Sequence, residues 1–108
     1  MSIWYRVRDL EAARMFYCQR LGFAEAYVDE EDRWARLTRG SAELALAEGE
    51  PAAEEAVLSV DVPDVRAEAE RLRGAGVRVG TVVEIAGTIR LLDVFDLDGN
   101  RLQLSQDL

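Results

Sequence analysis

An internal repeat constrains this chain more than any other feature of its sequence. The segment VRDLEA at 7–12 returns as VPDVRA at 62–67, 55 residues later. Each copy continues as a helical pattern that ends at a glycine, in LGF at 21–23 and in AGV at 75–77. A repeat of this kind is typical of a fold built from two similar units.

The first copy predicts one helix and four strands. Residues 2–8 alternate as a half-buried strand does. Asp9 then offers an N-cap to a helix whose apolar stripe ends at Leu21, before Gly22. Three short extended stretches follow at 24–28, 34–38 and 43–47. The order is β-α-β-β-β.

The second copy repeats that order. A strand at 57–62 leads into a helix that begins after Pro63-Asp64 and has its last apolar position at Ala75. Further extended stretches are expected at 77–84, 89–95 and 101–105, and Asp98-Gly99 predicts a hairpin between the last two.

The segment 48–55 has no strand pattern and carries acidic residues and a proline, so we interpret it as a linker. We therefore expect a single α+β domain over residues 1–108, with unit 1 at about 1–47 and unit 2 at about 56–108.

The composition excludes several kinds of chemistry. The chain has no histidine, and all 13 basic residues are arginines. Serine-histidine and cysteine-histidine catalysis are therefore excluded, as is a Schiff-base lysine. A zinc site would depend on Cys18 and carboxylates alone, which is a poor ligand set. The net charge of −8 argues against binding to nucleic acid and favours cationic or neutral ligands.

The single cysteine and the absence of a long apolar run predict where the chain resides. A single Cys18 requires no disulfide framework, and it has no histidine or lysine beside it that would activate its thiol. No secretory segment and no apolar run of 18 residues is present. We expect a cytoplasmic protein with no membrane partner.

The motifs together resemble the vicinal oxygen chelate superfamily, which includes glyoxalase I, bleomycin resistance proteins and extradiol dioxygenases. The resemblance rests on VRDLE at 7–11 with FY at 16–17 and LGF at 21–23, on DV at 64–65 with AGV at 75–77, and on FDLDGN at 95–100, where Leu97 replaces the usual proline. It implies two tandem βαβββ units whose mixed sheets curl around a cavity, often within a homodimer.

The resemblance also implies where a metal would bind. Metal-dependent members carry ligands at positions that correspond here to Ser2, Ala45, Val57 and Gln103. A divalent ion requires anionic or imidazole donors, and these four residues supply one neutral amide. We therefore expect no metal, no other cofactor and no catalytic residue.

Strand alternation predicts which side chains line the cavity. The candidate ligand-binding residues are Trp4, Arg6, Trp34, Ser59, Asp61, Asp93, Phe95 and Gln103. Several have alternative roles: Arg6 and Asp61 would pair with each other, the aromatic residues would fill the core or a dimer contact, and Asp93 would lie solvated at the rim.

Three functions remain open from the sequence. The first is a metal-free protein that sequesters a small cationic or aromatic molecule in a dimer cleft, as bleomycin resistance proteins do. The second is a lyase, isomerase or dioxygenase of the same superfamily with a degenerate site. The third is a non-catalytic interaction domain whose cavity is filled by its own side chains.

Overall fold

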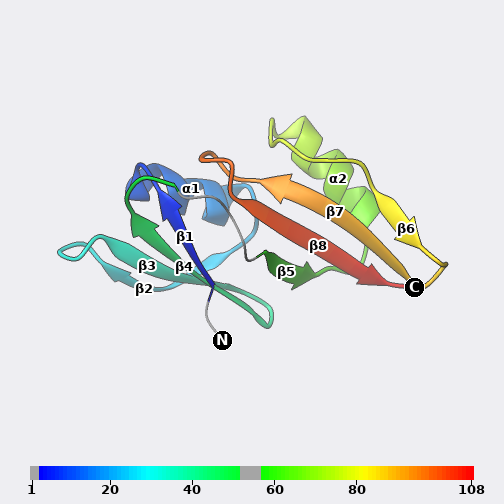
Figure 1. Cartoon of the computed structure of the whole chain (residues 1–108), viewed down its shortest axis with the longest axis horizontal. Helices are drawn as coiled ribbons and strands as arrows, with labels where there is room; N and C mark the ends of the chain where they lie inside the picture. Colours follow the sequence, from blue (N-terminus) through cyan, green and yellow to red (C-terminus); the bar gives the residue numbers. More distant parts are fainter. Residues whose placement is uncertain (1–2, 52–56) are drawn as a thin grey trace.

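The computed structural model describes residues 3–51 and 57–108 and contains two units of the same topology. The first unit comprises β1 (Ile3–Val7), α1 (Leu10–Gln19), β2 (Ala24–Asp29), β3 (Trp34–Arg39) and β4 (Ala42–Glu48). The second comprises β5 (Leu58–Asp61), α2 (Val65–Gly74), β6 (Val83–Ile85), β7 (Ile89–Phe95) and β8 (Arg101–Asp107). Figure 1 shows the two units side by side along the long axis of the molecule.

Each unit forms a four-stranded mixed sheet in which the first strand pairs with the last. The strand orders are β1-β4-β3-β2 and β5-β8-β7-β6. β1 runs parallel to β4 and β5 runs parallel to β8, whereas the other pairs are antiparallel. The α+β fold and the two tandem βαβββ units expected from the sequence are confirmed.

The repeated aspartate begins the helix of each unit. Oδ1 of Asp9 accepts a hydrogen bond from the amide of Ala12, and Oδ1 of Asp64 accepts one from the amide of Ala67, both at 3.1 Å. Each carboxylate satisfies an amide that has no partner within the helix. The repeat at 7–12 and 62–67 therefore encodes the same strand-to-helix junction twice.

One apolar core joins the helices to the sheets. Tyr5 and Val7 from β1 are buried with Leu10 of α1, and Val60 of β5 is buried with Val65 of α2. Because the alternate residues Trp4 and Arg6 are exposed, β1 has one face toward the core and one face free. Among the described residues, no helix is long and apolar enough to cross a membrane.

Polar contacts connect the two units. The hydroxyl of Tyr5 donates to the carbonyl of Arg101 and accepts a hydrogen bond from the amide of Leu58 at 3.0 Å. Nδ2 of Asn100 donates to the carbonyl of Arg6 at 3.0 Å. β1 is therefore tied both to the beginning of β5 and to the β7–β8 turn, which places the free faces of the two sheets in a fixed relation.

The structure modifies the local expectations for two segments, 77–84 and 48–55. The extended segment expected at 77–84 becomes a strand only at Val83. Before Val83 the described pairing is one bridge between Val79 and Val94, with hydrogen bonds from the Gly80 amide to the Asp93 carbonyl and from the Phe95 amide to the Arg78 carbonyl. The linker expected at 48–55 lies partly outside the described residues, and its first residue, Glu48, ends β4.

Candidate functional site

The free face of the first sheet carries Trp4, Arg6 and Trp34. Residues directly opposite one another in paired strands lie on the same face of a sheet. Trp4 is opposite Ala45, while Arg6 and Trp34 are both opposite Ala47 on either side of β4. The small alanines of β4 thus leave room on this face for the side chains of β1 and β3 to meet.

An aromatic cluster occupies this face. The ring centroids of Trp4 and Trp34 are 5.5 Å apart, and those of Trp34 and Tyr27 are 5.1 Å apart. The guanidinium of Arg36 lies 5.6 Å from the Trp34 centroid. Trp4 is 54% exposed and Tyr27 is 49% exposed, so their rings are open to solvent. The cluster is therefore an exposed aromatic surface on the free face of the first sheet.

Tyr27 and Arg36 were not predicted as site residues. Glu25 and Tyr27 have the same parity in the sequence, so regular alternation would place them on one face. A β-bulge between them places the two side chains on opposite faces of the sheet. Glu25 accepts a hydrogen bond of 3.0 Å from Nε of Arg14 in α1, whereas Tyr27 is opposite Arg36. No signal in the sequence indicates that bulge.

The free face of the second sheet is polar and acidic. Ser59 is opposite Gln103, which is opposite Asp93, and Asp61 is opposite Ser105. A cavity of about 130 Å³ opens here. It is lined by Thr81, Val83, Leu91, Asp93 and Gln103.

Asp93 is the centre of this polar face. Its Oδ1 accepts a hydrogen bond from Nε2 of Gln103 at 3.3 Å, and its Oδ2 lies 3.3 Å from Nη1 of Arg101. Phe95 lies beneath the guanidinium of Arg78, which is 4.2 Å from the ring centroid. The carboxylate therefore lies beside a small cavity and has partners that hold its orientation.

The predicted residues thus form two groups, one on each sheet. Trp4 and Trp34 contact each other in the first group, and Asp93 contacts Gln103 in the second. The suggested pairing of Arg6 with Asp61 is wrong, because no ion pair joins them in the described chain. Both side chains are exposed, so neither requires an opposite charge to offset burial.

The donor set does not fit a divalent metal at the positions the fold family uses. Ala45 is buried, Val57 is apolar and Gln103 offers a neutral amide that already donates to Asp93. Ser2 lies outside the described residues. A neutral amide with no imidazole or carboxylate at the companion positions is too weak a ligand set for such an ion.

Three carboxylates converge elsewhere, at the beginning of α1. Single oxygens of Asp9, Glu11 and Glu48 lie within 4.8 Å of one another and all three residues are exposed. Arg33 already donates to Glu11 at 2.7 and 2.9 Å and to Glu48 at 2.8 and 3.1 Å. These carboxylates therefore already have a cation, the guanidinium, and form a structural network.

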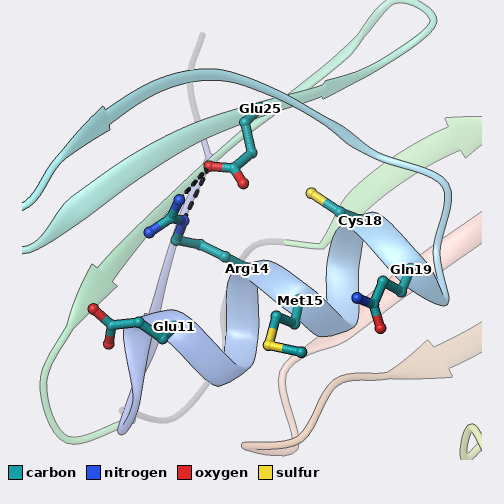
Figure 2. A pocket seen from close by; sticks show the side chains of 6 residues that line it. All are labelled: Glu11, Arg14, Met15, Cys18, Gln19 and Glu25. Atoms are coloured by element: carbon teal, nitrogen blue, oxygen red, sulfur yellow. Dashed lines mark hydrogen bonds and ion pairs between the residues drawn. The ribbon is translucent and has the colours of Figure 1, made fainter.

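A second hollow lies on the outer side of α1 and contains the cysteine. It measures about 270 Å³, and an ion pair of 2.9 Å between Arg14 and Glu25 spans it (Figure 2). Partial burial and the nearby Glu25 raise the pKa of the Cys18 thiol. The thiol therefore stays protonated and is a poor nucleophile.

Comparison with known proteins identifies the family. The profile of the Glyoxalase/Bleomycin resistance protein/Dioxygenase superfamily matches residues 2–104, and the chain belongs to this superfamily. No curated protein sequence matches the chain significantly.

Solved structures of the same fold include proteins with different activities. A superfamily member from Sphaerobacter thermophilus DSM 20745 is 23% identical with a TM-score of 0.85, over 98% of this chain and 94% of that one. TnmS3, an antibiotic binding protein from Streptomyces sp. CB03234, is 24% identical with a TM-score of 0.81, over 99% and 93%. Lactoylglutathione lyase from Agrobacterium tumefaciens is 15% identical with a TM-score of 0.81, over 98% and 91%. At these identities the likeness establishes the fold alone.

Proposed function

We propose that this chain is a metal-free small-molecule binding protein that sequesters a ligand on the free faces of its two sheets. The observation that carries the proposal is the exposed aromatic cluster of Trp4, Trp34 and Tyr27. Large aromatic side chains at a sheet surface are costly to leave in water unless a partner covers them. An antibiotic binding protein of the same fold supports this kind of role.

The two faces favour a ligand with an aromatic part and a cationic part. Indole rings bind flat aromatic groups by stacking and attract cations through their π-systems. The second sheet offers the carboxylates of Asp61 and Asp93, and the chain as a whole carries a net charge of −8. We expect the aromatic part to bind at Trp4 and Trp34 and the cationic part to bind beside Asp93.

We further propose that the two units act as one domain and that two copies form a homodimer. Each sheet presents an open face, and a second copy that faces it would close a cleft around the ligand. The exposure of Trp4 and Tyr27 does not favour a cavity filled by the chain's own side chains. No arrangement of the described residues favours lyase, isomerase or dioxygenase chemistry, because no acid-base pair or fitting metal site lines either face.

Isothermal titration calorimetry with bleomycin, metal-free and copper-bound, tests the proposal. We expect saturable binding that Trp4→Ala weakens by at least tenfold and Asp93→Asn weakens to a smaller extent. Leu108→Ala is the matched control, because Leu108 is also an exposed large apolar residue, at 50%, and belongs neither to the aromatic cluster nor to the lining of the Asp93 cavity. Equal binding by the wild type and Trp4→Ala would contradict the assignment of the site.

A further inference from the structure

A separate groove runs along α1 where this helix meets two turns of the second unit. Its volume is about 330 Å³, which is at the low end for ligand pockets. One wall is a stripe of α1 residues at helical spacing, and the other wall comes from the segment after α2 and from the β7–β8 turn. The main lining side chains are Met15, Phe16, Arg20, Ala75, Val77 and Leu97.

The groove is apolar on both walls. Met15 is 57% exposed on one wall and Leu97 is 62% exposed on the other, and the half-buried Phe16 lies at the core side. Met15 lines both this groove and the hollow beside Cys18 that Figure 2 shows. A molecule that lies between Met15 and Leu97 would therefore remove apolar surface from water on two sides.

Arg20 supplies the charge in this groove. Its amide donates to the Phe16 carbonyl at 2.8 Å and its carbonyl accepts from Nη1 of Arg71 at 3.0 Å, so its backbone is held in place. Its exposed guanidinium forms no ion pair or hydrogen bond with any residue in 3–51 or 57–108. None of the described residues that line the groove is a carboxylate.

Most arginines of the chain, in which acidic residues outnumber basic ones by 21 to 13, form an ion pair with a described carboxylate, whereas Arg20 does not. Arg14, Arg33, Arg39 and Arg71 all pair with glutamates. Arg20 instead lies among apolar side chains, where an incoming anion meets no competing carboxylate. The groove is therefore complementary to a molecule that has an apolar body and one negative group.

We propose that this groove binds a carboxylate with an apolar tail, such as a medium-chain aliphatic acid. The tail lies between Met15 and Leu97, and the carboxylate pairs with the guanidinium of Arg20. This site does not depend on the proposed function, because it shares no residue with the aromatic cluster or with the Asp93 cavity.

The probe is octanoate, observed through the methyl resonances of Met15 and Leu97 in a methyl NMR titration below the micelle concentration. We expect octanoate to shift both methyl resonances in a saturable way. Octylammonium, which has the same tail and the opposite charge, should cause no saturable shift at the same concentrations. Absence of saturable shifts would overturn the proposal. Equal responses to octanoate and octylammonium would also overturn it, because the site would then recognise the tail alone.

Two arginine variants test the charge. Arg20→Gln should weaken octanoate binding by about fivefold, the upper end for a solvent-exposed ion pair. Arg66→Gln is the matched control, because Arg66 is an exposed arginine of α2 that lies outside the groove and has no described ion pair. Equal weakening by both variants would contradict a specific contact with Arg20.

Octanoate shifts confined to the indoles of Trp4 and Trp34 would place the acid in the other site and overturn the proposal as well.

Discussion

The hydroxyl of Tyr17 donates a hydrogen bond of 2.8 Å to Oδ2 of Asp96, and this contact joins α1 of the first unit to the β7–β8 turn of the second. Asp96 also accepts from the amides of Asp98 and Asn100 and from the side chain of Asn100, at 2.8 to 2.9 Å. Burial raises the pKa of Asp96 although the hydrogen bonds from Asn100 and Tyr17 oppose that change. The pKa of Tyr17 is raised mainly by burial and, to a smaller extent, by the negative charge of Asp96.

Replacing Tyr17 by phenylalanine should therefore destabilise the contact between the units. Tyr17→Phe removes one donor to a buried carboxylate, which costs roughly 1.5–3 kcal/mol of unfolding free energy. Urea denaturation of purified protein measures this loss. Tyr27→Phe is the matched control, since the Tyr27 hydroxyl is exposed and has no described hydrogen bond, and its effect should stay within about 0.5 kcal/mol. Equal losses in the two variants would contradict the importance of the Tyr17 contact.

Arg33 should control the titration of Glu11. The hydrogen bonds from Arg33 lower the pKa of Glu11 from 4.5 to about 2. A carboxyl whose pKa is lower in the folded protein contributes stability that is present above about 4.5 and is lost as the pH falls toward 2. Carboxyl NMR titration should show Glu11 returning toward 4.5 in Arg33→Gln but not in Arg66→Gln. A wild-type Glu11 that titrates near 4.5 would refute the network.

The two N-caps should contribute similar but unequal stability. Asp64→Ala should cost about 1 kcal/mol of unfolding free energy, since it leaves the Ala67 amide without its acceptor. Asp9→Ala should cost less, because it also removes one of three mutually repelling carboxylates beside Glu11 and Glu48. Urea denaturation compares the variants, with Asp32→Ala of the exposed β2–β3 turn as the control. A larger loss for Asp9→Ala would show that the repulsion is negligible.

The fold was predictable because the repeat encodes local geometry. Short segments carry most of the information. They include the N-caps Asp9 and Asp64, the glycines Gly22 and Gly76 that follow the helices at φ of 74° and 78°, and the alternation of the strands. Alternation also predicted the free faces: Trp4, Asp61 and Gln103 all lie on the side opposite the core.

The remaining features depend on contacts between distant residues or on irregular backbone. Tyr17 and Asp96 are 79 residues apart, so no local pattern indicates that they meet. Tyr27 reaches the aromatic cluster through a bulge that reverses its parity. The groove beside Arg20 arises where α1, the end of α2 and the β7–β8 turn converge, which depends on how the two units pack.

Tryptophan fluorescence tests the central claim most directly, because the two tryptophans of the chain are Trp4 and Trp34, both in the aromatic cluster. The titration uses bleomycin in metal-free and copper-bound forms, with divalent ions alone as the control. Ligand sequestration on this face predicts a saturable change in indole emission with the drug and no change with the ions. Saturable change with the ions alone would contradict a metal-free binding protein and favour a metal-dependent enzyme instead.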